Sequence, residues 1–174
     1  HALKRFLPLL FNNNYTIILI EQTTEPPNPK REITQIFSPG TYIEEINKSD
    51  PNFIVSIYLT EHDCYKTGSS VFMVGLSAID LSTGQNIIYQ GSVNSYDKNA
   101  LLEDIYRFIE SNNPKEILFY SNELSKVSTN EIRQTLNSMN RIVHLHFNDI
   151  EKKFFQISYQ NAFLGKIFPN HGLL

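Results

Sequence analysis

Apolar and polar residues alternate along this 174-residue chain in patterns that predict both helices and strands. Near the start, apolar side chains recur at helical spacing over 3–11, which predicts a helix. Runs rich in β-branched residues at 15–20 and 33–37 predict two strands. The segment 25–29 between them is a loop, because proline cannot donate a hydrogen bond to a sheet. One helix and two strands bury too little surface for a core, so we interpret residues 1–38 as a truncated domain.

The middle and later parts of the chain predict a mixed sheet. Strands are expected at 53–59 and 71–79 around a polar loop at 60–70, and turn residues at 82–85 bring the chain back as a third strand over 86–93. The rest of the pattern predicts a helix at 101–109, a strand at 117–120, a weaker helix at 132–139 and a strand at 142–147. Because crossover helices place later strands parallel to an earlier one, this order predicts an α/β fold with a mixed five-stranded sheet flanked by helices.

Proline and glycine mark the boundary between these two parts. Pro39 and Pro51 enclose a segment rich in turn residues, and we expect a hinge at Pro39, Gly40 and Pro51. The pair Pro39-Gly40 predicts a type II turn, in which the glycine takes a positive φ. Apolar residues after Asp149 predict helices that leave the sheet domain. The expected divisions are a truncated domain at 1–38, a linker at 39–51, a sheet domain at 52–148 and departing helices at 149–174.

Composition narrows the class of protein. Hydrophobic residues make up 41% of the chain and charged residues 19%, as in globular proteins. The net charge of −3 argues against a free-standing nucleic-acid-binding module, which usually carries a basic surplus. The single Cys64 excludes disulfide frameworks and favours an intracellular compartment, whether cytoplasm, nucleus, organelle or viral factory. No segment approaches the roughly 18 apolar residues that span a bilayer, and the start at His1 rather than Met suggests an excised piece.

Short motifs along the chain stand in an order that resembles a known family. The run Ile17–Gln22 is followed by Lys30–Glu32, then by Ser38–Thr41, and later by Asp80–Gly84. This order and spacing resembles the MutS family of DNA mismatch-recognition ATPases, from the end of the mismatch-binding domain into the connector domain. The Gly-rich ATPase loop and the mismatch-reading Phe-x-Glu element of that family are both absent from this sequence.

The resemblance implies an interior fragment of a larger DNA repair protein that acts in the DNA damage response. Residues 1–38 would be the partial α/β remnant of the mismatch-binding domain, 52–148 an RNase H-like connector domain, and 149–174 the start of the lever helices. In the family, the connector relays signals between the mismatch-binding end and the ATPase and lever domains. The fragment is therefore expected to be no enzyme and to hold no cofactor. The parent would be a dimeric DNA-dependent ATPase that binds mismatched DNA, uses ATP and magnesium, and meets a MutL-type partner.

The alternative is a metal-dependent nuclease or resolvase that uses Asp80. RNase H-like nucleases hold divalent metals with an Asp on an early hairpin strand, an acid from the first helix and another at the end of the fourth strand. Glu103, Asp104 or Glu110 would supply the helix member, but the fourth predicted strand ends on the neutral Asn122. Asp80 also opens a turn of Ser, Thr and Gly, where Asp commonly accepts hydrogen bonds from backbone N–H groups. The turn role is favoured.

Two groups of residues have the chemistry of metal ligands without the spacing. His62, Asp63 and Cys64 are adjacent in a predicted loop, and successive side chains diverge too much to converge on one ion. His144 and His146 lie two apart in a predicted strand and therefore share a face, where they could bind a metal or sense pH. Because no third ligand is spaced to complete either set, we predict no metal site.

Basic pairs are sparse before the linker, where Lys4 and Arg5 precede Lys30 and Arg31. In the family, the mismatch-binding domain touches the DNA backbone, so Lys30 and Arg31 are candidate phosphate contacts. Glu32 follows them directly, and its negative charge could neutralise part of their positive charge. A solvated strand face is an equally good interpretation of this pair.

Overall fold

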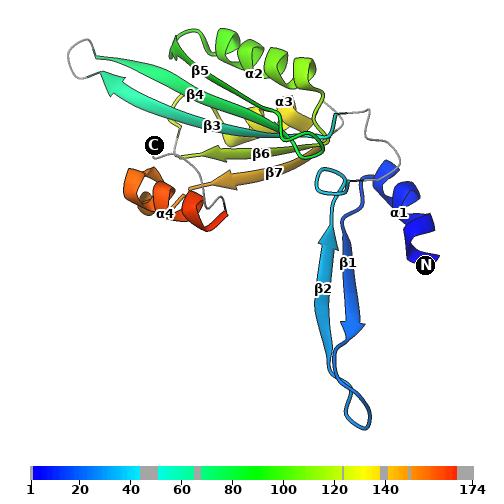
Figure 1. Ribbon diagram of the computed structural model, residues 1–174. Coiled ribbons are helices and arrows are strands. Elements are labelled where there is room, and N and C mark those ends of the chain that lie inside the picture. The colour runs from blue at the N-terminus through cyan, green and yellow to red at the C-terminus, as the bar shows by residue number, and fades with distance from the viewer. Residues whose placement is uncertain are drawn as a thin grey trace.

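The fold is described from a computed structural model, which covers residues 2–43, 51–64, 68–122, 124–137, 141–148 and 150–167. Figure 1 shows a long two-stranded hairpin with a helix beside it, joined to a five-stranded sheet that carries helices. The α/β fold with a mixed five-stranded sheet flanked by helices is thereby confirmed. None of the described helices is both long and apolar enough to cross a bilayer.

The N-terminal part consists of helix α1 and an antiparallel hairpin, as the sequence predicts. Its elements are α1 (Ala2–Asn12), β1 (Ile17–Gln22) and β2 (Arg31–Phe37). Ile18 pairs with Ile36, and the register shifts between Leu19 and Ile20, which is the mark of a bulge. The hairpin points away from the larger sheet (Figure 1). Its strands therefore have no sheet neighbours besides each other among the described residues.

The larger sheet has the order β5-β4-β3-β6-β7. Strands β3, β4 and β5 form an antiparallel meander, while β6 runs parallel to β3 and β7 runs parallel to β6. This arrangement is compatible with an RNase H-like connector domain. The strands are β3 (Phe53–Cys64), β4 (Ser69–Asp80), β5 (Asn86–Asn94), β6 (Glu116–Ser121) and β7 (Ile142–Phe147), and the crossover helices are α2 (Lys98–Asn112) and α3 (Thr129–Asn137).

One face of this sheet forms the core beneath α2 and α3. Alternate strand residues point to that face and are almost completely buried, as a period of two requires. Each such side chain contributes roughly 1.5–3 kcal/mol of hydrophobic free energy. The core includes Val55, Ile57 and Leu59 of β3, Phe72, Val74 and Leu76 of β4, Ile117 and Phe119 of β6, and Leu101, Ile105 and Ile109 of α2.

The predicted loop at 60–70 is wrong over most of its length. Strand β3 continues to Cys64 and β4 begins at Ser69, so that His62 pairs with Val71 and Asp63 with Ser70. Polar residues suggested a loop because this end of the hairpin lacks apolar side chains. Backbone hydrogen bonds to the neighbouring strand are sufficient to extend the ladder there.

The second face of the sheet, which we call the open face, is covered only in part by the described residues. The 3₁₀ helix η1 (Lys152–Phe155) places Phe155 against Tyr58, with ring centroids 5.7 Å apart. Helix α4 (Ile157–Ile167) follows, so helices do come after the sheet as expected. Met139 of the predicted helix at 132–139, and Asp149, where the departing segment was expected to begin, lie outside the described residues.

Candidate functional site: the junction between hairpin and sheet

Asp80 ends β4 and is buried, with 1% of its surface exposed. Its Oδ1 accepts hydrogen bonds from the backbone N–H of Asn52 (3.0 Å) and from both the N–H (2.9 Å) and the hydroxyl (2.7 Å) of Ser82. Its Oδ2 accepts from the Thr83 hydroxyl at 2.6 Å. Burial alone would raise the pKa of Asp80, but these hydrogen bonds outweigh it and hold the pKa far below the usual range. Asp80 therefore has the turn role that was predicted.

The end of the fourth sheet strand lies far from Asp80. Asp80 pairs with Phe53 at the start of β3, and Glu116 at the start of β6 pairs with Ile54. Because β6 runs parallel to β3, Asn122, which follows β6, lies at the opposite end of these strands from Asp80. The two strand positions that a nuclease site needs are thus at opposite ends of the strands.

The helix acids have other partners as well. Glu103 forms an ion pair with Arg107, and Glu110 forms one with Arg141. Asp104 accepts a hydrogen bond from the Tyr89 hydroxyl at 3.2 Å. Across the described ranges, no three His, Cys, Asp or Glu side chains are grouped so that they could hold a metal ion.

His62 and Asp63 occupy a strand instead of the predicted loop, and this prediction is corrected accordingly. Adjacent strand residues point to opposite faces, so the two side chains diverge. His62 lines a groove of about 550 Å³ on the open face, together with Tyr58, Gly75 and Ile88. The side chain of Cys64 lies outside the described residues.

Asp63 lies near the carboxyl ends of β3, β6 and β7, where a cleft of about 440 Å³ is also lined by Glu61, Asn122 and Phe147. Glu61 accepts hydrogen bonds from the backbone N–H (2.6 Å) and the hydroxyl (2.8 Å) of Ser125. Burial raises the pKa of Glu61, but these bonds outweigh it and the pKa is lowered. The carboxylate thus fastens the loop after β6.

His144 and His146 share a face of β7, as their spacing predicts, but they serve different partners. His144 Nε2 lies 3.1 Å from Oε2 of Glu116. The ring of His146 stacks on Tyr120, with centroids 4.8 Å apart and planes inclined by 12°. Each imidazole is thus engaged with a side chain of the neighbouring strand β6.

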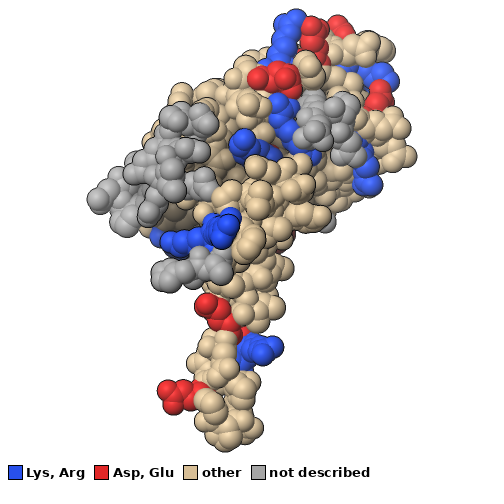
Figure 2. Space-filling view, turned by 90° about the vertical axis from the view of Figure 1, so that its right-hand side faces the viewer, with Lys and Arg blue, Asp and Glu red and all other residues tan. Residues whose placement is uncertain are grey.

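Lys30 and Arg31 are exposed on the hairpin, as a backbone contact to DNA would require. In Figure 2 this arm shows one basic patch with acidic patches above and below it, so it presents no continuous basic surface from that side. The contact of Lys30 and Arg31 with DNA stays a prediction.

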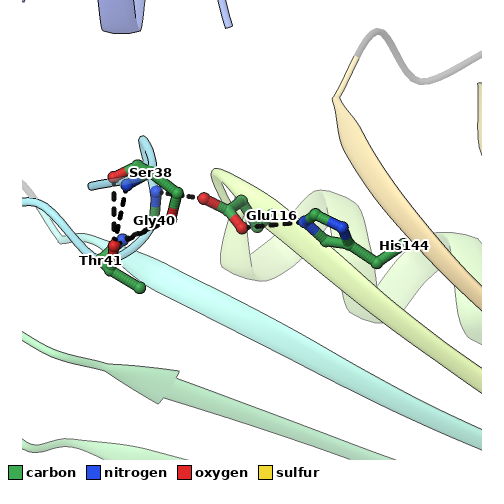
Figure 3. Close-up of polar contacts among 5 residues, drawn as sticks. All are labelled: Ser38, Gly40, Thr41, Glu116 and His144. Atoms are coloured by element: carbon green, nitrogen blue, oxygen red, sulfur yellow. Dashed lines mark hydrogen bonds and ion pairs between the residues drawn. The ribbon is translucent and has the colours of Figure 1, made fainter. Parts of the chain in front are cut away.

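The expected hinge begins with a turn that is docked on the sheet (Figure 3). The N–H of Gly40 donates to Oε1 of Glu116 at 2.7 Å, and the other carboxylate oxygen faces His144. The predicted type II turn is wrong, because Gly40 has no positive φ. Close packing explains the glycine instead: a Cβ would lie 3.0 Å from Cγ1 of Ile54 and 3.1 Å from Glu116.

The far side of the expected hinge is described only at its end. Pro51 is exposed and directly precedes Asn52, whereas residues 44–50 of the predicted linker lie outside the described residues. Asn52 Nδ2 donates to the carbonyl oxygens of Gly40 (2.8 Å) and Tyr42 (3.2 Å). Sequence reasoning missed both Asn52 and Glu116. The available signal was a polar residue placed directly before, or at the first position of, a strongly apolar strand.

Comparison with known proteins shows that the chain is similar to DNA mismatch repair proteins. A mutS homologue of Acanthamoeba polyphaga mimivirus is 25% identical over 187 aligned residues, covering 99% of this chain and 16% of the relative. The DNA mismatch repair protein MutS of Prochlorococcus marinus is 30% identical and covers 90% of this chain. MutS of Dehalococcoides mccartyi is 33% identical and covers 68%. The chain spans 17% and 12% of the length of these two relatives.

No protein-family model matches the chain. Among solved structures, a chain of the simian T-cell lymphotropic virus intasome in complex with a PP2A regulatory subunit covers 70% of this chain, and 44% of that chain is covered. Its TM-score of 0.33 and identity of 12% are too low to support a conclusion.

Proposed function

Because the chain belongs to the MutS family of DNA mismatch repair proteins, we propose that it is the connector region of such a protein. In this role it joins the mismatch-binding end to the ATPase and lever domains, and it relays movement between them. The observation that carries the proposal is a complete sheet domain placed between two incomplete parts. The sheet has its own core beneath α2 and α3, whereas the described residues of the hairpin and of α4 form no such core.

The hairpin has the exposed apolar surface of an unfinished domain. Ile18, Ile20, Ile33 and Ile36 are each 54–60% exposed, although they lie in strands. A two-stranded hairpin is only marginally stable in water unless other elements cover its apolar side chains. This supports the assignment of residues 1–38 to the end of the mismatch-binding domain.

Helix α4 has the same character at the other end of the chain. None of its described residues is buried, and Ile157, Phe163 and Ile167 are 51–61% exposed. An amphipathic or apolar helix of this kind requires neighbours. This supports the assignment of residues 149–174 to the beginning of a helical lever domain.

The mechanism we propose is mechanical. The sheet domain moves as one body, and the mismatch-binding end and the ATPase bias the same rearrangement through it. Within this chain both carboxylate oxygens of Asp80 accept hydrogen bonds, and the acidic residues of α2 have partners of their own. These acids therefore have structural roles, which favours a coupling function over a nuclease. ATP and magnesium would bind the parent outside this segment. The dimeric parent would contact mismatched DNA and a MutL-type partner.

The test uses the full-length protein that carries this segment. A short flexible Gly-Ser insertion after Ile43 should reduce the stimulation of ATP hydrolysis by mismatched DNA, while mismatch affinity and basal hydrolysis persist. The matched control places the same insertion next to Gly68, an exposed turn residue between β3 and β4, and should leave the stimulation unchanged. Full stimulation in the protein with the insertion after Ile43 would refute the coupling role.

A further inference from the structure

Tyr42 contacts both parts of the chain. Its ring lies 4.7 Å from the ring of Phe11 in α1 and 6.0 Å from that of Phe37 in β2, measured between centroids. Its carbonyl oxygen accepts a hydrogen bond from Asn52, which directly precedes β3. The side chain of Tyr42 therefore packs on the N-terminal part, whereas its backbone is hydrogen-bonded to the sheet domain.

The peptide groups of Gly40 are held on both sides. The N–H donates to Glu116 at 2.7 Å and the carbonyl accepts from Asn52 Nδ2 at 2.8 Å. Asn52 is itself fixed, because its own N–H donates to the buried carboxylate of Asp80. The turn is thus fastened to β6 through Glu116 and to the β4–β5 turn through Asn52 and Asp80.

The turn also packs closely against the sheet. Gly40 packs so near to Ile54 and Glu116 that no Cβ can be added without displacing them. The turn closes on itself through the hydroxyls of Ser38 and Thr41, whose oxygens are 2.8 Å apart. It can therefore leave the sheet as a unit without losing these internal bonds.

Glu116 is 5% exposed while the turn covers it. If the turn departs, the carboxylate regains water, which compensates much of the lost hydrogen bond. Burying a charge without a partner is costly. Because the Glu116 carboxylate is buried only while the turn covers it, no unpaired buried charge remains when the turn departs, and this favours a reversible contact. His144, on the next strand β7, holds the second carboxylate oxygen and orients it.

We propose that Gly40, Tyr42, Asn52 and Glu116 form a lock that holds the α1–β1–β2 unit in one direction relative to the five-stranded sheet. The lock opens when Glu116 releases the N–H of Gly40. Its closed form fixes the hinge, and its open form lets the hairpin swing. This inference goes beyond the coupling role and does not depend on it, since the lock is a property of this chain in the absence of DNA and nucleotide.

The experiment measures the distance between the two parts by double electron–electron resonance. Spin labels are attached at Glu32→Cys on β2 and Arg133→Cys on α3, both exposed positions, in a Cys64→Ser background. The otherwise unchanged full-length protein, in the absence of DNA and nucleotide, should give one narrow distance distribution. Glu116→Ala should broaden and shift it, because the hairpin then samples several directions.

Matched variants separate the lock from general loss of stability. Glu103→Ala removes an exposed carboxylate from the same domain and should leave the distribution narrow. Glu116→Gln keeps an oxygen for the N–H of Gly40 and should restore most of the narrow peak.

A folded Glu116→Ala protein with the original distribution would overturn the proposal. If Glu116→Ala does not fold, Gly40→Ala decides in the same way, since it removes no polar group. Failure here would leave the insertion test of the coupling role intact.

Discussion

Glu116 and His144 occupy neighbouring parallel strands, and their side chains meet with 3.1 Å between Oε2 and Nε2. Leu118 pairs with His144 in the register of β6 and β7, so the contact reaches diagonally toward the amino end of the sheet. The remaining oxygen of Glu116 holds the turn at Gly40. The carboxylate of Glu116 thereby connects His144 of the edge strand β7 to the turn at Gly40, which follows the hairpin.

Hydrogen exchange should detect this connection at the level of one amide. The Gly40 N–H bonds to a charged group, and such bonds contribute about 1.5–3 kcal/mol. Glu116→Ala should therefore accelerate exchange of that amide by roughly tenfold or more. The Gly84 N–H, which donates to the Asp80 carbonyl at 2.8 Å, is the internal control and should keep its rate in this variant. Equal rates at Gly40 in both proteins would contradict the account.

Acid should destabilise the chain through Asp80. Its pKa is lowered on folding, so its contribution is fully present above the unfolded value of about 3.9 and is lost as the pH falls through the folded value. Asp80→Asn should lower the free energy of unfolding at pH 7 by about 1–3 kcal/mol, and should flatten the fall in stability below pH 4. Denaturant titrations at several pH values measure both effects. The exposed Glu25→Gln serves as the control, and an equal acid response in wild type and Asp80→Asn would exclude this role.

The purified chain should leave nucleic acid intact. The Asp80 carboxylate is occupied by Asn52, Ser82 and Thr83, so it offers no free oxygen to a divalent ion. Incubation with branched DNA and with RNA–DNA hybrid, in magnesium or manganese, should yield no cleavage above a buffer control. Metal-dependent cleavage that disappears in Asp80→Asn would establish the nuclease alternative instead.

Core and open-face residues should differ sharply in their effect on stability. Ile57 is completely buried in β3, whereas Ile88 in β5 is 79% exposed. Ile57→Ala should lower the free energy of unfolding by about 2–5 kcal/mol, because it leaves a cavity. Ile88→Ala should change it by no more than about 0.5 kcal/mol. Thermal or urea unfolding of the two variants compares them directly, and similar losses would contradict the assignment of the core.

Sequence reasoning identified the elements that bury a regular apolar pattern. The stripe through Leu101, Ile105 and Ile109 predicted α2, and the strand at 142–147 was predicted with its observed bounds. It failed where backbone pairing alone extends a strand, as at His62 and Asp63. An alternation of apolar and polar residues reveals a strand only where one face is buried, and His62 and Asp63 are not buried.

The contacts between the sheet and the segment after the hairpin could not be predicted either, and the reason is different. Glu116 meets Gly40 across 76 positions of sequence, and no local pattern encodes such a contact. The sequence predicts that Gly40 is needed for its backbone freedom, whereas the structure shows that it is needed because a Cβ would collide with Ile54 and Glu116. The fold of the sheet was thus accessible from periodicity, whereas the side chains that join it to the hairpin required the tertiary structure.

The most direct test of the coupling role follows two distances in the full-length protein. One label pair, at Arg107→Cys and Arg133→Cys, reports on the sheet domain alone, and the other, at Glu32→Cys and Arg133→Cys, spans the junction. Addition of mismatched DNA and ATP should change the distance across the junction and leave the distance within the sheet domain unchanged. A changed distance within the sheet domain, or an unchanged distance across the junction, would contradict a rigid body that relays movement.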